Sequence, residues 1–270
     1  MKKLGLTLGG GGSRCFAHLG MFEELIKNKI PLDYIVASST GSIIATLVAN
    51  NVEIESIKKE FYKLSTRLKW FIPGGFFTFN QKVIRDMLNN LLDNKQIEKS
   101  KIPITIIGTN LNNGNEVLFE KGDIIKAVCA SSAQPLVYRP IKYGSRYISD
   151  GSIIDSIPAD ICREKVGKNN IVLASSLDGP LDTEVKRFDK FHTMFRAIYI
   201  PLLHFRKIIV HQNSDIILEP LKDIKFNFHN WKHLLNFGDI TLMEHYFNRG
   251  KNEAKLKMNL IKKLVNEKTN

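Results

Sequence analysis

Cysteines and long apolar runs are scarce in this sequence, and each shortage excludes a class of protein. The three cysteines, Cys15, Cys129 and Cys162, are an odd number without metal-like spacing. A chain of 270 residues forms a substantial apolar core without disulfide bonds, so we expect reduced thiols in a cytoplasmic protein. The longest apolar candidate, residues 197–205, is far shorter than the ~20 residues that cross a bilayer. The first apolar stretch reaches glycine after about six residues, too few for a signal peptide.

Acidic residues are also in short supply, with 27 of them against 39 lysines and arginines, which gives a net charge of +12. Such a surface concentrates anionic partners, either nucleic acid or acidic lipid, and charge alone does not choose between them. The basic residues are spread along the chain without a recognised nucleic-acid-reading motif, so no nucleic-acid partner is expected. Ordinary hydrophobic and charged contents, 43% and 24%, indicate a globular protein. Because no linker or repeat divides it, residues 1–270 are expected to form a single domain.

Two strand–loop–helix units open the chain. Residues 4–8 form a short apolar run that ends in four glycines, and apolar residues then recur at helical spacing. Residues 34–37 repeat the pattern before another apolar helix. Consecutive units of this kind predict an α/β fold, here a three-layer α/β/α arrangement around a central, mainly parallel sheet. Later elements are predicted as strands at 102–108, 116–119, 146–149, 171–175 and 216–218, and as a last helix at about 242–265.

A serine occupies the turn between the second predicted strand and its helix. A nucleophile elbow requires small residues two positions before and two after the serine, because the strand and helix backbones nearly touch there. Only Ser39, with Ala37 and Gly41, meets this requirement in the sequence ASSTG. Helix capping is the plainer explanation for a serine at this position, so the context has to decide.

The glycine-rich loop, residues 9–12, also joins a strand to a helix. Backbone N–H groups at a helix N-terminus form an anion site, which suits the oxyanion that develops on an ester carbonyl. A nucleotide phosphate loop fits less well, because GxGxxG would need glycine where Arg14 stands and GxxxxGK is absent.

An aspartate–glycine pair, Asp150-Gly151, follows the strand predicted at 146–149. Such a pair is usually a tight turn. A serine nucleophile nevertheless needs a base, and an aspartate held against it in a partly desolvated pocket would have a raised pKa.

A Ser-His-Asp triad is the alternative, with His211 or His245 as the base. A single βα unit precedes Ser39, whereas the α/β-hydrolase fold usually places several strands before its nucleophile, and this argues against the triad. His18 is interpreted as a helix-surface or core residue.

Together these pieces resemble the patatin-like phospholipase family. GGGGSRCFAHLG is similar to that family's glycine-rich motif GGGxRG, Ser39 matches its nucleophile, and Asp150-Gly151 matches its DG[GA] site. The segment 127–140, AVCASSAQPLVYRP, is similar to the family's A-S-x-A-x-P segment. The likeness runs over about residues 3–160. Three positions depart from the family's glycine or alanine, all with small side chains, and they are Cys15, Ala37 and Ser152.

The resemblance implies a Ser/Asp dyad that hydrolyses fatty acyl esters of a phospholipid or another lipid, without a cofactor or a metal. Ser39 would attack the acyl carbonyl while Asp150 accepts its proton, and water would then release the fatty acid. The implied oxyanion hole consists of Gly10, Gly11, Gly12, Arg14 and Thr40. A catalytically weak or inactive lipid-binding protein of the same fold is the alternative, favoured if Cys15 and Ala37 spoil the site.

Two aromatic segments are additions to the predicted sheet. Residues 68–79 surround a Pro-Gly-Gly hinge and either pack as a core loop or line and cover an acyl pocket. The substrate-binding candidates in this segment are Trp70, Phe71, Phe76 and Phe77. Residues 185–212 predict a basic amphipathic helix, kinked at Pro201, that packs on the sheet or docks peripherally on an anionic membrane.

Overall fold

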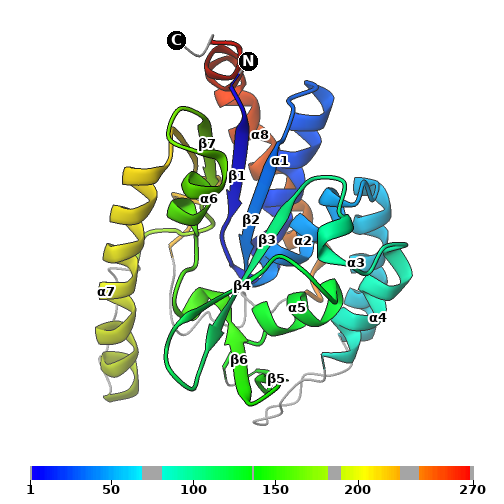
Figure 1. The fold of residues 1–270 in the computed structure, drawn as a ribbon, viewed down its shortest axis with the longest axis vertical. Coiled ribbons are helices and arrows are strands. Elements are labelled where there is room, and N and C mark those ends of the chain that lie inside the picture. Colours follow the sequence, from blue (N-terminus) through cyan, green and yellow to red (C-terminus); the bar gives the residue numbers. More distant parts are fainter. Residues whose placement is uncertain (1, 69–80, 136, 182–189, 226–236, 268–270) are drawn as a thin grey trace.

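The computed structural model describes residues 2–68, 81–135, 137–181, 190–225 and 237–267 (Figure 1). Within these ranges an eight-stranded mixed sheet lies at the centre, with β4 paired to β3 beside the order β5-β6-β3-β2-β1-β7-β8. The strands are β1 Leu4–Leu8, β2 Tyr34–Ser38, β3 Ile104–Asn110, β4 Glu116–Phe119, β5 Ile141–Tyr143, β6 Arg146–Asp150, β7 Ile171–Ser175 and β8 Ile216–Leu218. The strands from β3 to β8 in this order pair in parallel, whereas β4, β5 and β6 pair antiparallel.

Helices cover both faces of the sheet (Figure 1). They are α1 Phe16–Lys27, α2 Thr40–Ala49, α3 Ile54–Leu68, α4 Lys82–Leu91, α5 Ile124–Ser131, α6 Ala159–Val166, α7 Lys190–Asn213 and α8 Ile240–Asn266, with the short 3₁₀ turns η1 Gly12–Cys15, η2 Ile97–Lys99 and η3 Gly151–Ile153. Leu4, Leu6 and Leu8 alternate along β1 and join the main core with residues of α1, α2 and α8. Val36, Ile107 and Val172 project to the other face, where they pack on α6. The predicted three-layer α/β/α fold is therefore confirmed.

The register of β3 brings two distant strand ends together. β4 pairs with residues 106–109 of β3 and so occupies one of its edges. β2 pairs with residues 104–107 and β6 with residues 108–110, so both lie end to end along the other edge. Because β2 runs parallel to β3 and β6 runs antiparallel to it, their C-terminal ends meet. Ser38 lies opposite Ile107 and Asp150 lies opposite the next residue of β3, Gly108.

Most predicted elements are found close to their predicted bounds, and β5 is the strand that the sequence did not indicate. Residues 4–8, 116–119, 171–175 and 216–218 are strands with the predicted limits. The predicted basic helix is α7 over its described part, and Pro201 lies inside it without ending it. Among the described helices, none combines the length and the apolar character needed to cross a bilayer.

Candidate functional site

Ser39 lies on a sharp turn between β2 and α2. Its backbone has φ 53° and ψ −135°, a conformation that side-chain-bearing residues rarely adopt and that needs support from the surrounding structure. Such strain is typical of the nucleophile elbow. A Cβ atom at Gly41 would lie 2.7 Å from the carbonyl oxygen of Gly9, so only glycine allows α2 to approach the end of β1 this closely. Ala37 stands where the related motif has glycine. It is fully buried in the core, so the methyl group that it adds is accommodated.

The hydroxyl of Ser39 donates a hydrogen bond to the carboxylate of Asp150, with 2.7 Å between Oγ and Oδ2. The other carboxylate oxygen, Oδ1, accepts from the N–H of Ser152 at 2.8 Å. Complete burial raises the pKa of Asp150 from 3.8 to about 6, although the hydrogen bonds from Ser39 and Ser152 lower it in part. At neutral pH the carboxylate is therefore ionised and close enough to accept the proton of Ser39.

The end of α5 and the turn after it hold both residues in place. Ser131 Oγ accepts the backbone N–H of Ser39 at 2.9 Å. The carbonyl oxygen of Ala133 accepts the N–H of Asp150 at 3.2 Å and the hydroxyl of Ser149 at 2.7 Å. This explains the A-S-x-A-x-P segment physically, since one turn of chain fixes the serine and the aspartate together. The sequence drew attention to this segment but gave no role for Ser131.

The glycine loop lies directly against Ser39. A Cβ atom at Gly10 would be 2.7 Å from the Cβ atom of Ser39, so a side chain there would displace the serine. The N–H of Gly10 donates to the Ser156 carbonyl at 3.1 Å, which makes this glycine an anchor of the loop. The N–H of Gly11 donates to Thr40 Oγ1 over 3.3 Å, a long and replaceable contact.

The N–H groups of Gly12 and Thr40 complete the set of candidate oxyanion donors. Each belongs to the first residue of a helical turn, η1 and α2 respectively. The first N–H groups of a helix have no carbonyl acceptor within that helix. The hydrogen bond of Gly10 thus narrows the candidate donors to Gly11, Gly12 and Thr40.

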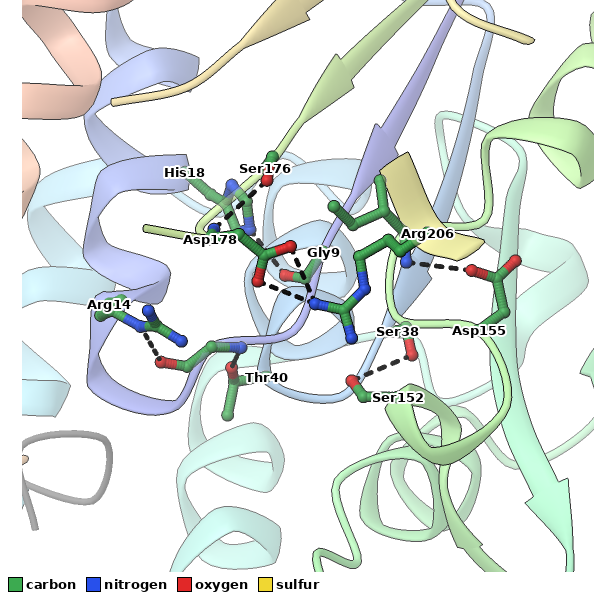
Figure 2. Close-up of polar contacts among 12 residues, drawn as sticks. Gly9, Arg14, His18, Ser38, Thr40, Ser152, Asp155, Ser176, Asp178 and Arg206 are labelled. Carbon is green, nitrogen blue, oxygen red and sulfur yellow. Dashed lines mark hydrogen bonds and ion pairs between the residues drawn. The ribbon is translucent and has the colours of Figure 1, made fainter. Parts of the chain in front are cut away.

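Arg14 fixes the orientation of the Gly11 peptide. Its Nε donates to the Gly11 carbonyl oxygen at 3.2 Å, while the N–H of Gly11 points to Thr40 (Figure 2). Cys15, at the position where the related motif has glycine, is fully buried and belongs to the main core. Burial raises the pKa of its thiol to about 12, so the side chain stays neutral. The side chain at this position is thus accommodated in the core.

His18 has a role that the sequence did not indicate. Its Nε2 lies 2.8 Å from the carbonyl oxygen of Gly9 (Figure 2). Its Nδ1 lies 2.9 Å from Ser175 Oγ. A carbonyl only accepts, so Nε2 donates to Gly9, and Nδ1 accepts from the Ser175 hydroxyl. Burial lowers the pKa of His18 to about 4, so the imidazole is neutral at physiological pH. The interpretation of His18 as a core residue is confirmed, with the addition that it holds the start of the glycine loop.

The two histidines weighed for a triad lie elsewhere. His211 and His245 are exposed on α7 and α8. The hydrogen bonds of the Asp150 carboxylate come from Ser39 and Ser152 instead.

Ser152 adds a hydroxyl beside the site where the related motif has glycine or alanine. Its Oγ lies 3.5 Å from Ser38 Oγ (Figure 2). The substrate-binding candidates Trp70, Phe71, Phe76 and Phe77 lie outside the described residues. In the part of the chain that the structure describes, no group of three or more His, Cys, Asp and Glu side chains is placed to hold a metal ion.

Comparisons with known proteins agree with this architecture. The lysophospholipase NTE1 of Debaryomyces hansenii is 28% identical over 181 residues, which cover 62% of this chain and 11% of that protein. An uncharacterised NTE family protein of Mycobacterium tuberculosis is 28% identical over 159 residues, which cover 58% of this chain and 44% of that protein. The chain therefore spans less than half the length of these relatives.

Two solved structures share the fold. Human GIVD cytosolic phospholipase A2 has a TM-score of 0.55 at 10% identity, with 98% of this chain and 60% of that chain covered. VipD from Legionella pneumophila has a TM-score of 0.52 at 12% identity, with 97% of this chain and 67% of that chain covered. A family model of the patatin-like phospholipases matches residues 6–163. Since this match covers more than half of the chain and includes both Ser39 and Asp150, the chain belongs to the patatin-like phospholipase family.

Proposed function

We propose that this chain hydrolyses fatty acyl esters of lipids through a dyad of Ser39 and Asp150. The observation that carries the proposal is the 2.7 Å hydrogen bond from a serine on a strained elbow to a fully buried carboxylate. The conformation of Ser39, with φ 53° and ψ −135°, costs energy, and such strained positions cluster at active sites, which supports a functional role for this serine.

The reaction begins when Asp150 accepts the proton of Ser39 as the serine oxygen attacks the acyl carbonyl. The N–H groups of Gly11, Gly12 and Thr40 stabilise the negative charge that develops on the carbonyl oxygen, and the long Gly11–Thr40 contact is exchanged for the oxyanion. The tetrahedral intermediate then collapses, the C–O bond to the alcohol breaks, and the alcohol leaves with the proton from Asp150. In the second half Asp150 takes a proton from the water that attacks the acyl-enzyme. The bond between the acyl carbon and Ser39 Oγ then breaks, Asp150 returns its proton to Ser39 Oγ, and the fatty acid is released.

The proposed substrate is a phospholipid, a lysophospholipid or another acyl-ester lipid. Relatives of the chain carry the names lysophospholipase and cytosolic phospholipase A2, which supports this class. The net charge of +12 supports an acidic lipid surface as the setting, because it concentrates anions near the protein.

Labelling with a fluorophosphonate probe, followed by assays on a panel of lipid esters, tests the proposal. We expect covalent labelling of the wild type and of the control Ser132→Ala, which removes a buried hydroxyl that makes no hydrogen bond in the described structure. Ser39→Ala should not be labelled, and Asp150→Asn should react on the order of 10³-fold more slowly because its base is gone. Labelling that persists in folded Ser39→Ala, or folded wild type that neither labels nor hydrolyses any ester, would contradict the dyad.

A further inference from the structure

Helix α7 exposes an apolar face. Of the fifteen large apolar side chains that are exposed in the described part of the chain, six lie on α7. Five of them recur at intervals of three and four and so project from one face of the helix, with 38% to 62% of each side chain exposed. These five define the α7 apolar face and are Met194, Ile198, Leu202, Phe205 and Ile208.

The opposite side of α7 is fixed to the protein. Leu203 and Val210 are buried, and Arg206 Nη1 lies 2.8 Å from both carboxylate oxygens of Asp178 (Figure 2). A helix on the surface of a soluble domain normally turns polar residues outward. In the part of the chain that the structure describes, the inward side of α7 is already occupied by packing, and the outward apolar residues are left exposed.

The inner side of α7 contacts the loops that support the glycine loop. Asp178, the partner of Arg206, follows Leu177, and the Leu177 side chain lies so close to Gly11 that a Cβ atom there would be 2.8 Å away. Helix α7 is therefore linked to Gly11, a candidate oxyanion donor, through the Arg206–Asp178 ion pair and the packing of Leu177 against Gly11.

We infer that the α7 apolar face docks on the surface of an anionic lipid bilayer. Exposed Lys190 and Lys207 lie on the same helix, and the chain as a whole carries +12, so an anionic surface attracts it whereas a second copy of the chain repels it. The helix is not apolar enough to cross a bilayer. Its outward residues would instead enter the headgroup and acyl boundary, as in peripheral amphipathic helices. The inference rests on the proposed function only in that a membrane would hold the substrate.

Sedimentation with lipid vesicles tests the inference without relying on catalysis. The vesicles contain phosphatidylcholine alone or equal amounts of phosphatidylcholine and phosphatidylglycerol, and the protein carries Ser39→Ala so that no lipid is consumed. We expect binding to the mixed vesicles, weaker binding at high salt, and little binding to phosphatidylcholine alone. Changing both Ile198 and Phe205 to Gln should lower partitioning about tenfold or more, because both side chains lose their apolar contact with the bilayer.

The matched control is Leu256→Gln, which changes the most exposed large apolar residue of α8, with 81% of its side chain accessible. This control should bind vesicles like its parent. Equal binding by the α7 variant and the control, or a change in oligomeric state without a change in vesicle binding, would overturn the inference. In an otherwise wild-type background, the α7 variant should keep its hydrolysis of a soluble short-chain ester and lose hydrolysis of vesicle lipid. If the parent hydrolyses neither but the vesicle results hold, the docking surface stands and the proposed function fails.

Discussion

The carboxylate of Asp150 is fully buried and has lost its contact with water. Two hydrogen bonds, from the Ser39 hydroxyl and the Ser152 N–H, compensate for part of the lost hydration. The balance leaves its pKa at about 6, where the group is ionised at neutral pH yet basic enough to take a proton from serine. The same residue would be a poorer base at the surface, where its pKa would be near its ordinary value.

The pH dependence of turnover reports this balance. We expect kcat/KM for a soluble ester to rise as the pH increases to about 6 and then level off, because the base acts only after Asp150 loses its proton. Below the pKa the rate should fall about tenfold per pH unit. The Ser132→Ala control should give the same profile. A rate that stays constant from about pH 5 to about pH 8 would show that a different group serves as the base.

At the scale of elements, the local part of the site was predictable and the supports between elements were not. The sequence predicted the strand at Leu4–Leu8 and the elbow at Ser39 because each depends on neighbouring residues: an apolar run that stops at glycine, and small residues around a serine. The hydrogen bond from Gly10 to Ser156 joins residues that are far apart in the chain. Asp150 meets Ser39 only because β6 pairs with β3, which the sequence does not reveal. Strand β5, with three residues, was too short and too polar to produce a recognisable strand pattern.

The glycine loop is the element whose support can be tested most directly. His18→Ala removes the donor to the Gly9 carbonyl, so the loop should loosen beside Ser39, and kcat should fall about tenfold while KM changes little. His18→Gln offers an amide N–H in nearly the same place and should recover much of the loss. The midpoint of the pH profile should stay at about 6 in both variants, because the proposed base is Asp150 and not His18.

Steady-state kinetics on a soluble ester separates these outcomes, with circular dichroism to verify folding. Complete loss of turnover in folded His18→Gln, or a shift of the pH midpoint in folded His18→Ala, would assign His18 a direct part in proton transfer. An unchanged kcat in His18→Ala would show that the loop keeps its position without the imidazole.

Considered as a whole, the molecule places Ser39 and Asp150, the proposed reactive groups, where one edge of β3, the glycine loop and the turn after α5 converge. The strands that position the two proposed catalytic residues, β2 and β6, belong to a single sheet, which supports the proposal that residues 1–270 form one domain. Helix α7 is held to this assembly by the Arg206–Asp178 ion pair, both of whose side chains are largely buried. Burying this ion pair and the Asp150 carboxylate removes charges from water, and the desolvation lowers the free energy of unfolding.

The cost of the buried carboxylate should appear in the stability of the whole chain. The folded-state pKa of Asp150, about 6, is above its ordinary value of 3.8, so folding favours the protonated form. The resulting stability is present at low pH and is lost as the pH rises through about 6. Asp150→Asn cannot ionise, so it should be more stable than the wild type at about pH 8, on the order of 2–3 kcal/mol, and by much less near pH 4.

Thermal or urea unfolding at several pH values measures this difference. The control is Ser39→Ala, which is also expected to be inactive but keeps the carboxylate and removes the hydrogen bond that Ser39 donates to it. This variant should be less stable than the wild type at about pH 8. Loss of activity alone does not distinguish the two variants. Their stabilities do, because Asp150→Asn should be more stable and Ser39→Ala less stable than the wild type at about pH 8. If Asp150→Asn and the wild type differed by the same amount at every pH, the carboxylate of Asp150 would have the same pKa in the folded and unfolded chain, and its proposed tuning as a base by burial would be wrong.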